Sequence, residues 1–142
     1  MTGPFRQRPS VAELNRGAEN SAISTLGILI TEIGEDFVRG TMPVDARTKQ
    51  PYGLLHGGSS VLLAESLAST AANLCLDDPQ RQQAVGVEIN ANHLRAVTSG
   101  TVTGTARAIN VGRSIQVWDI RIEDEQGRAV CVSRLTLAVR NS

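Results

Sequence analysis

One stretch of the chain combines residue types that can do chemistry. His56 is followed directly by Gly57 and Gly58, and Glu65 is the single charged residue among positions 57–76. Glycines at a helix start let a ligand oxygen approach the unpaired backbone N–H groups, and the helix dipole favours negative charge there. An isolated carboxylate on the same helix can act as a base or a nucleophile. The combination predicts an acyl-transfer site in which the helix start polarises a carbonyl group.

Each of these residues also has a purely structural explanation. Glu65 could bond to a distant arginine or backbone amide, the glycines could form a tight turn, and His56 could cap the helix. No basic residue lies three or four positions away from Glu65, so it has no partner on its own helix. A helix without a charged stripe must be enclosed, either by a sheet or by a second subunit.

The spacing along the helix separates the two parts of the predicted site. Gly57 and Glu65 are eight residues apart, which is about 12 Å along an axis that rises ~1.5 Å per residue. One small reacting group cannot easily contact both in the same chain. The spacing therefore predicts that the oxyanion donor and the carboxylate come from different subunits across a two-fold interface.

The other local signals predict an α+β domain that positions this helix. Ser10 and Glu13 form a capping-box pattern at the start of a short helix, and the long helix is expected at residues 58–76, before Pro79. Short connections between successive strands require antiparallel directions. The extended segments are expected at residues 26–34, 36–44, 84–94, 100–110, 114–123 and 129–139.

One strand has a break in its alternating pattern. Trp118, Ile120 and Ile122 share one face, whereas Ile115 and Val117 are out of phase with them. The pattern predicts a bulge near Val117. Trp118 is expected to anchor the core or an interface rather than to hold a substrate.

Length and composition limit the function classes. The 142 residues predict a single domain, with residues 1–9 flexible, and the 14 basic and 14 acidic residues are mixed, which disfavours a nucleic-acid-binding surface. The apolar runs fall short of the ~20 residues of a membrane span, and no signal peptide is evident, so a cytoplasmic location is expected. Cys75 and Cys131 are expected to be free, buried thiols, with no metal site.

The residues around the long helix resemble the hotdog-fold acyl-CoA thioesterases. The resemblance rests on "MPVDARTKQPYGLLHGGSSVLLAESLAS", "VGVEINANHLR" and "GRSIQVWDIRIEDEQGR", and it covers about residues 10–139. The stretch "EINANHLR" is most similar to the branch that holds the 1,4-dihydroxy-2-naphthoyl-CoA thioesterase of menaquinone synthesis and the proofreading thioesterase of enterobactin synthesis. The resemblance implies an antiparallel sheet wrapped around the long helix. It also implies edge-to-edge dimers, paired again as tetramers, with active sites at the dimer interface.

The resemblance further implies roles for individual residues. Glu65 corresponds to the catalytic carboxylate, as nucleophile or general base, and Gly57 to the backbone donor that polarises the thioester carbonyl. Ser69 corresponds to a hydroxyl that assists the carboxylate or positions water. Three side chains correspond to groups beside the thioester or the acyl group, namely His56, Gln50 and His93.

The predicted activity is hydrolysis of an aromatic or otherwise bulky acyl-CoA thioester. No cofactor is expected beyond the CoA of the substrate, and Arg95 and Arg113 are candidate ligands for its phosphates. A phenylacetyl-CoA-type thioesterase of aromatic catabolism is the main alternative. A hotdog hydratase is disfavoured because "HGGSSVLLAE" lacks a His or Asp–His signature with proline-rich neighbours. A non-catalytic acyl-CoA-binding hotdog protein would have no need of Glu65.

Overall fold

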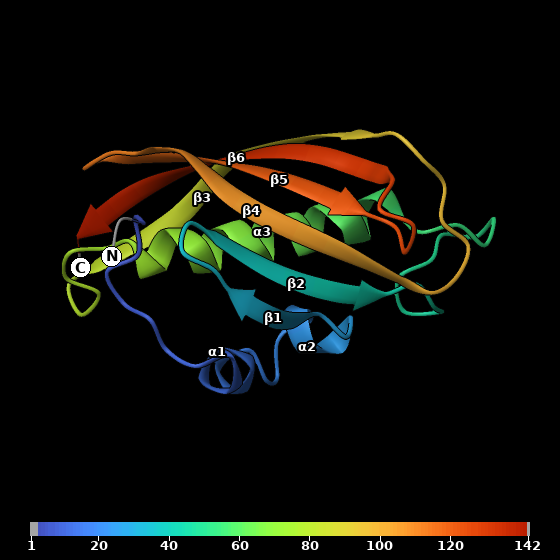
Figure 1. Cartoon of the computed structure of the whole chain (residues 1–142), viewed down its shortest axis with the longest axis horizontal. Coiled ribbons are helices and arrows are strands. Elements are labelled where there is room, and N and C mark those ends of the chain that lie inside the picture. Colours follow the sequence, from blue (N-terminus) through green and yellow to red (C-terminus); the bar gives the residue numbers. More distant parts are fainter. Residues whose placement is uncertain (1–2, 142) are drawn as a thin grey trace.

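The computed structural model describes residues 3–141, in which an antiparallel sheet curls around one long helix (Figure 1). The order in the sheet is β1-β2-β4-β5-β6-β3, so β1 and β3 are its edges. This is the hotdog arrangement that the resemblance implied. The helices are α1 (Val11–Gly17), α2 (Ala22–Thr25) and α3 (Gly57–Leu74). The strands are β1 (Leu29–Ile33), β2 (Phe37–Pro43), β3 (Gln82–His93), β4 (Thr101–Val111), β5 (Ile115–Glu123) and β6 (Ala129–Asn141).

Local sequence signals predicted these elements except α2, where no helix was expected. The capping box of α1 is formed, with the Ser10 hydroxyl accepting from the Glu13 N–H at 3.1 Å. Helix α3 starts one residue earlier than expected and ends at Leu74. Strands β3 and β4 run in opposite directions as predicted, but they do not pair. After the intervening loop β4 lies on the far side of β5 and β6, and β3 instead pairs with β6 at the edge of the sheet.

The bulge predicted in β5 near Val117 is wrong. Burial alternates without a break along β5, because Gln116 belongs to the buried face with Trp118. The Gln116 side chain donates to the Ala72 carbonyl at 3.2 Å and accepts from the Trp118 indole N–H at 2.8 Å. The irregularity lies instead in the neighbouring strand β4, at Ile109. Gln116 is polar, but its hydrogen bonds are formed inside the core, so the hydrophobic pattern did not show which face of β5 is buried.

The segment before α1 is held against the core. Phe5 is buried and its ring stacks on that of Trp118, with 6.2 Å between the centroids. The backbone N–H groups of Arg6 and Gln7 both donate to the Leu74 carbonyl, at 2.8 and 3.1 Å. The flexible N-terminus expected over residues 1–9 therefore does not describe residues 3–9, and residues 1 and 2 lie outside the described part. Trp118 is fully buried, as predicted for a core anchor.

Helix α3 has two kinds of surface. The face toward the sheet is buried and consists of leucine, alanine and serine side chains. A second, half-buried stripe contains Leu62, Glu65, Ser69 and Asn73 and faces α1 and α2. These short helices lie on the side of α3 that the sheet leaves open (Figure 1). Within residues 3–141, no helix is both long enough and apolar enough to cross a membrane.

Candidate active site

The start of α3 is built around His56. His56 is the N-cap, and its Nδ1 accepts a hydrogen bond from the Gly58 N–H at 2.8 Å. Its carbonyl accepts from the N–H groups of Ser59 and Ser60. Among residues 3–141, no atom accepts a hydrogen bond from the Gly57 N–H. The capping explanation of His56 therefore holds, and the cap leaves one amide of the first turn free to bind an oxyanion.

A cavity of about 420 Å³ opens beside this amide. Gly57 lies against His93 so closely that a Cβ at position 57 would be 2.9 Å from His93 Nε2. The loop that carries Gln50 is held by two backbone bonds, from Gln50 N–H to the Leu54 carbonyl and from His56 N–H to the Thr48 carbonyl, each 2.8 Å long. Four predicted site residues line this cavity, namely Gln50, Gly57, His93 and Arg95.

A second, larger cavity of about 620 Å³ lies between α3 and the two N-terminal helices. Glu65 and Ser69 line it, one helical turn apart. Glu65 is half-buried, and no hydrogen bond or ion pair satisfies its carboxylate within residues 3–141. The hydroxyls of Ser66 and Thr70 each donate to the helix carbonyl four residues earlier, at 2.6 and 2.8 Å. Their protons are therefore directed away from Glu65, which faces the cavity without a partner.

The two cavities have no lining residue in common. Within one chain, the structure thus places the free Gly57 amide with Gln50 and His93, and it places Glu65 with Ser69. It does not bring these two groups into one pocket. This agrees with the separation of about 12 Å expected from the helical rise.

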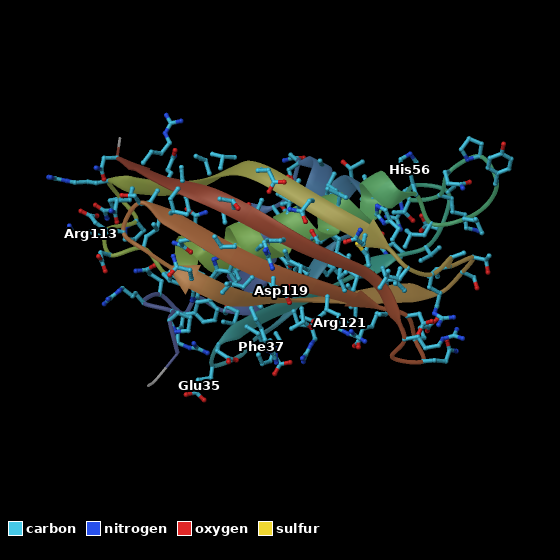
Figure 2. The ribbon with its side chains drawn as sticks, turned by 90° about the horizontal axis from the view of Figure 1, so that it is seen from above. Glu35, Phe37, His56, Arg113, Asp119 and Arg121 are labelled. Atoms are coloured by element: carbon cyan, nitrogen blue, oxygen red, sulfur yellow. The ribbon has the colours of Figure 1, made fainter. Side chains whose placement is uncertain are left out.

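Two further predicted residues lie outside both cavities. The His56 side chain is exposed, and its Nδ1 is occupied by the cap. Arg113 lies at the opposite end of the molecule from His56 (Figure 2). It lines a third cavity of about 330 Å³ together with Arg6, Asp77 and Gln82. In one chain, Arg113 is therefore far from Arg95.

The sequence did not indicate which residues enclose Glu65 from the N-terminal side. Glu13, Gly17, Ala18 and Ala22 line the Glu65 cavity. The capping box revealed that α1 exists, but no local pattern shows where a short helix packs. Similarly, no pattern revealed that Gly86 of β3 lies beside the Glu65 carboxylate.

The cysteines are buried and free, as predicted. Burial raises the pKa of the Cys75 thiol to about 11 and also raises the pKa of Cys131. Both thiols are therefore protonated near neutral pH and are poor nucleophiles. Within residues 3–141, no three histidine, cysteine or acidic side chains are grouped as metal ligands would be.

Comparisons with known proteins agree with this arrangement. Residues 52–131 match the family model described as the thioesterase superfamily. The crystal structure of a thioesterase from Haemophilus influenzae superposes with a TM-score of 0.93 at 52% identity, covering 96% of this chain and 94% of the other. The 1,4-dihydroxy-2-naphthoyl-CoA hydrolase of Escherichia coli is 47% identical over 95% of this chain and 98% of its own length. The proofreading thioesterase EntH of Cronobacter sakazakii is 45% identical, over 95% and 97% respectively.

Proposed function

The chain belongs to the thioesterase superfamily and is a hotdog-fold thioester hydrolase, and from this premise we propose that it hydrolyses aromatic acyl-CoA thioesters with Glu65 as the reacting carboxylate. The position of Glu65 carries the proposal. It is the half-buried, unpartnered carboxylate of a cavity large enough for a ring system. A carboxylate that faces a cavity without a protein partner is available to a bound substrate or to a water molecule.

The proposed chemistry follows from the groups at the two cavities. The Gly57 N–H binds the thioester oxygen and stabilises its negative charge as the tetrahedral intermediate forms. Glu65 either attacks the carbonyl carbon or removes a proton from the water that attacks it. The C–S bond then breaks, and the CoA thiolate leaves. If water attacked, the free acid is the product, whereas after attack by Glu65 the acyl group stays on its carboxylate as a mixed anhydride, which a water molecule then hydrolyses to the acid. Ser69 positions the water or the carboxylate, and Gln50 and His93 orient the thioester from the Gly57 cavity. His56 acts through its cap, which holds the helix start that presents the Gly57 amide to the thioester. Because a thiolate departs readily, these steps require neither a metal nor an added cofactor.

We further propose that two subunits form each site. Strand β3 is a free edge of the sheet, and it carries the exposed apolar side chain of Val87. Two copies paired in antiparallel fashion along β3 would place their α3 helices side by side in opposite directions. The Gly57 amide of one subunit would then approach Glu65 of the other, and this would unite the two cavities that a single chain keeps apart. Pairing of two such dimers into a tetramer remains a prediction.

The shape of the Glu65 cavity supports a bulky acyl group. Its volume of about 620 Å³ lies within the range typical of small-molecule sites. Gly17, Ala18 and Ala22 give the N-terminal wall small side chains, while Leu14 and Ile23 make it apolar. Such a wall leaves room for a flat ring. The name of the Escherichia coli relative, a hydrolase of a naphthoyl thioester, agrees with this size.

Thiol release from a panel of acyl-CoA esters tests the proposed substrate class. The panel contains benzoyl, hydroxybenzoyl, hydroxynaphthoyl and phenylacetyl esters beside acetyl, butyryl and hexanoyl esters. We expect the highest kcat/KM with aryl esters. A preference for phenylacetyl-CoA would support the alternative role in aromatic catabolism. Binding of the esters without hydrolysis would support a non-catalytic acyl-CoA-binding protein, and activity restricted to short straight chains would refute the aromatic assignment.

Ala22→Phe is expected to change acyl selectivity without removing activity. The new ring enters the Glu65 cavity from its N-terminal wall, where the Ala22 side chain now leaves space. We expect kcat/KM for hydroxynaphthoyl-CoA to fall about tenfold or more, with a much smaller change for acetyl-CoA. Thr25→Phe is the matched control, because Thr25 is exposed on the same short helix and does not line the cavity. Equal losses with both esters would place the acyl group elsewhere.

We also propose that Arg95 of one subunit and Arg113 of its partner bind the CoA phosphates. An antiparallel β3 pair would bring the His93 end of one strand to the Gln82 end of the other. Arg95 follows the first end, and Arg113 lines the cavity at the second. The two arginines are distant within one chain, but in such a dimer they would lie at the same opening of the shared site.

Arg95→Ala is expected to raise KM for acyl-CoA about tenfold, because an arginine–phosphate contact is lost. The KM for the matching acyl-pantetheine, which carries no phosphate, should not change. Arg134→Ala, at an exposed position on β6, serves as the control for loss of positive charge. A parallel rise in both KM values would assign Arg95 to the acyl part of the substrate instead.

A further inference from the structure

The carboxylate of Glu65 lies against the edge strand β3. A Cβ atom added to Gly86 would lie 2.5 Å from Glu65 Oε2, and 3.4 Å from the Cδ1 atom of Leu135. The distance to Leu135 is an ordinary contact, so it is the Glu65 oxygen alone that occupies the space a side chain at position 86 would need. The backbone of Gly86 is not in the left-handed region. Space beside the Glu65 carboxylate, rather than conformational freedom, therefore distinguishes glycine from alanine at this point of the strand.

Helix α3 and strand β3 are locked together close to this contact. The Asn73 amide group donates to the Ala84 carbonyl and accepts from the Ala84 N–H, both at 3.1 Å. It also donates to the Ser69 carbonyl at 2.8 Å. Because Asn73 is on the helix that carries Glu65, this pair of bonds fixes the distance between helix and strand. The strand cannot retreat from Glu65 to make room for a larger residue.

The alternation of an antiparallel ladder extends this argument to Gly86. Ala84 turns its N–H and C=O toward Asn73, and hence away from β6. Residues two apart on a strand point their backbone groups to the same side, so Gly86 also turns its backbone toward the free edge. The pairing register with β6 then shifts between Gly86 and Glu88, which makes Val87 a bulge. Bulges of this kind re-aim the chain beside functional sites.

We propose that Gly86 is a positioning residue for the hydrolytic reaction. Its missing side chain lets the Glu65 carboxylate lie at the free edge of the sheet, where the substrate of a shared site would enter. The Asn73–Ala84 bonds hold the strand at that distance. The inference rests on the proposed catalytic role of Glu65, and it assigns to the strand a task that the family resemblance does not give it.

Gly86→Ala tests the proposal. The added methyl group displaces a flexible carboxylate rather than backbone, so the protein should fold with a melting temperature close to that of the wild type. We expect kcat for the best aryl-CoA ester to fall about 10- to 100-fold, with KM changed less than about twofold, because a displacement near 1 Å is enough for such a loss. Gln83→Ala, exposed on the same strand, should keep wild-type kcat. Size-exclusion chromatography shows whether the oligomer is unchanged.

A double variant separates positioning from a general structural effect. If Gly86 acts only through the Glu65 carboxylate, adding Gly86→Ala to Glu65→Gln should cause no further loss of the residual kcat. A full additional loss in the double variant, or a kcat for Gly86→Ala within threefold of wild type, would overturn the proposal. The single variant Glu65→Gln tests the catalytic assignment itself. An error in the catalytic role of Glu65 would therefore be detected separately from an error in the positioning role of Gly86.

Discussion

Glu65→Gln is expected to lower kcat by roughly 10³-fold, while KM and the melting temperature stay close to wild-type values. Glutamine has nearly the same shape, so the Glu65 cavity and its contact with Gly86 remain. The amide can neither take a proton from water nor attack the thioester. Thiol release from the best aryl-CoA ester, over a range of substrate concentrations, measures kcat and KM separately.

The control for this variant is Glu19→Gln, which neutralises an exposed glutamate outside both cavities. It should hydrolyse the ester at the wild-type rate. If Glu65→Gln keeps more than a tenth of the wild-type kcat, Glu65 is not the reacting group. Glu13, the other carboxylate that lines the same cavity, would then be the next candidate.

Mixing two inactive variants is expected to restore activity. Gly57→Val places a side chain against His93 and over the free amide, so it should inactivate the donor half of the site. Glu65→Gln inactivates the carboxylate half. After random exchange of subunits, half of the dimers are mixed, and each mixed dimer contains one intact site. The mixture should therefore recover about a quarter of wild-type activity, measured as thiol release.

The matched control mixes Glu65→Gln with Glu65→Ala. These variants damage the same half of the site, so no combination of them can form an intact one. Native mass spectrometry of differently tagged subunits shows that exchange has occurred. Full exchange with no recovery in the Gly57→Val mixture would mean that each chain builds its site alone, and that one chain must then change shape to join its two cavities.

Local signals in the sequence predicted the parts of the site, but not their assembly. The cap at His56, the free start of α3 and the isolated Glu65 all follow from neighbours a few residues away. Gln50 and His93 share a cavity with Gly57, and their roles beside the thioester and the acyl group stay predictions. The α+β composition and the strand positions were predicted correctly because each strand has its own turn signals.

The remaining features depend on contacts between residues distant in sequence. The wall that α1 and α2 form over Glu65 depends on where two short helices pack, and no periodicity encodes that position. Phe5 appeared to belong to a free end because its partner Trp118 is more than a hundred residues away. The alternation of β5 was misinterpreted as a bulge because the hydrogen-bond partners of Gln116, Ala72 and Trp118, are known only from the fold. Tertiary packing overrides local pattern in each case.

The bonds between Asn73 and Ala84 also have a consequence for solubility. An open strand edge is a template onto which any extended chain can add, and it is a common origin of aggregation. At Ala84 both backbone groups are already taken by the chain's own side chain, so an incoming strand finds nothing to bond there. Slipped pairings that extend past this point are disfavoured, and the usable edge has a defined end. One asparagine thus limits how far another chain could add along this edge, and the proposed pairing of two subunits would use the part of β3 that follows Ala84.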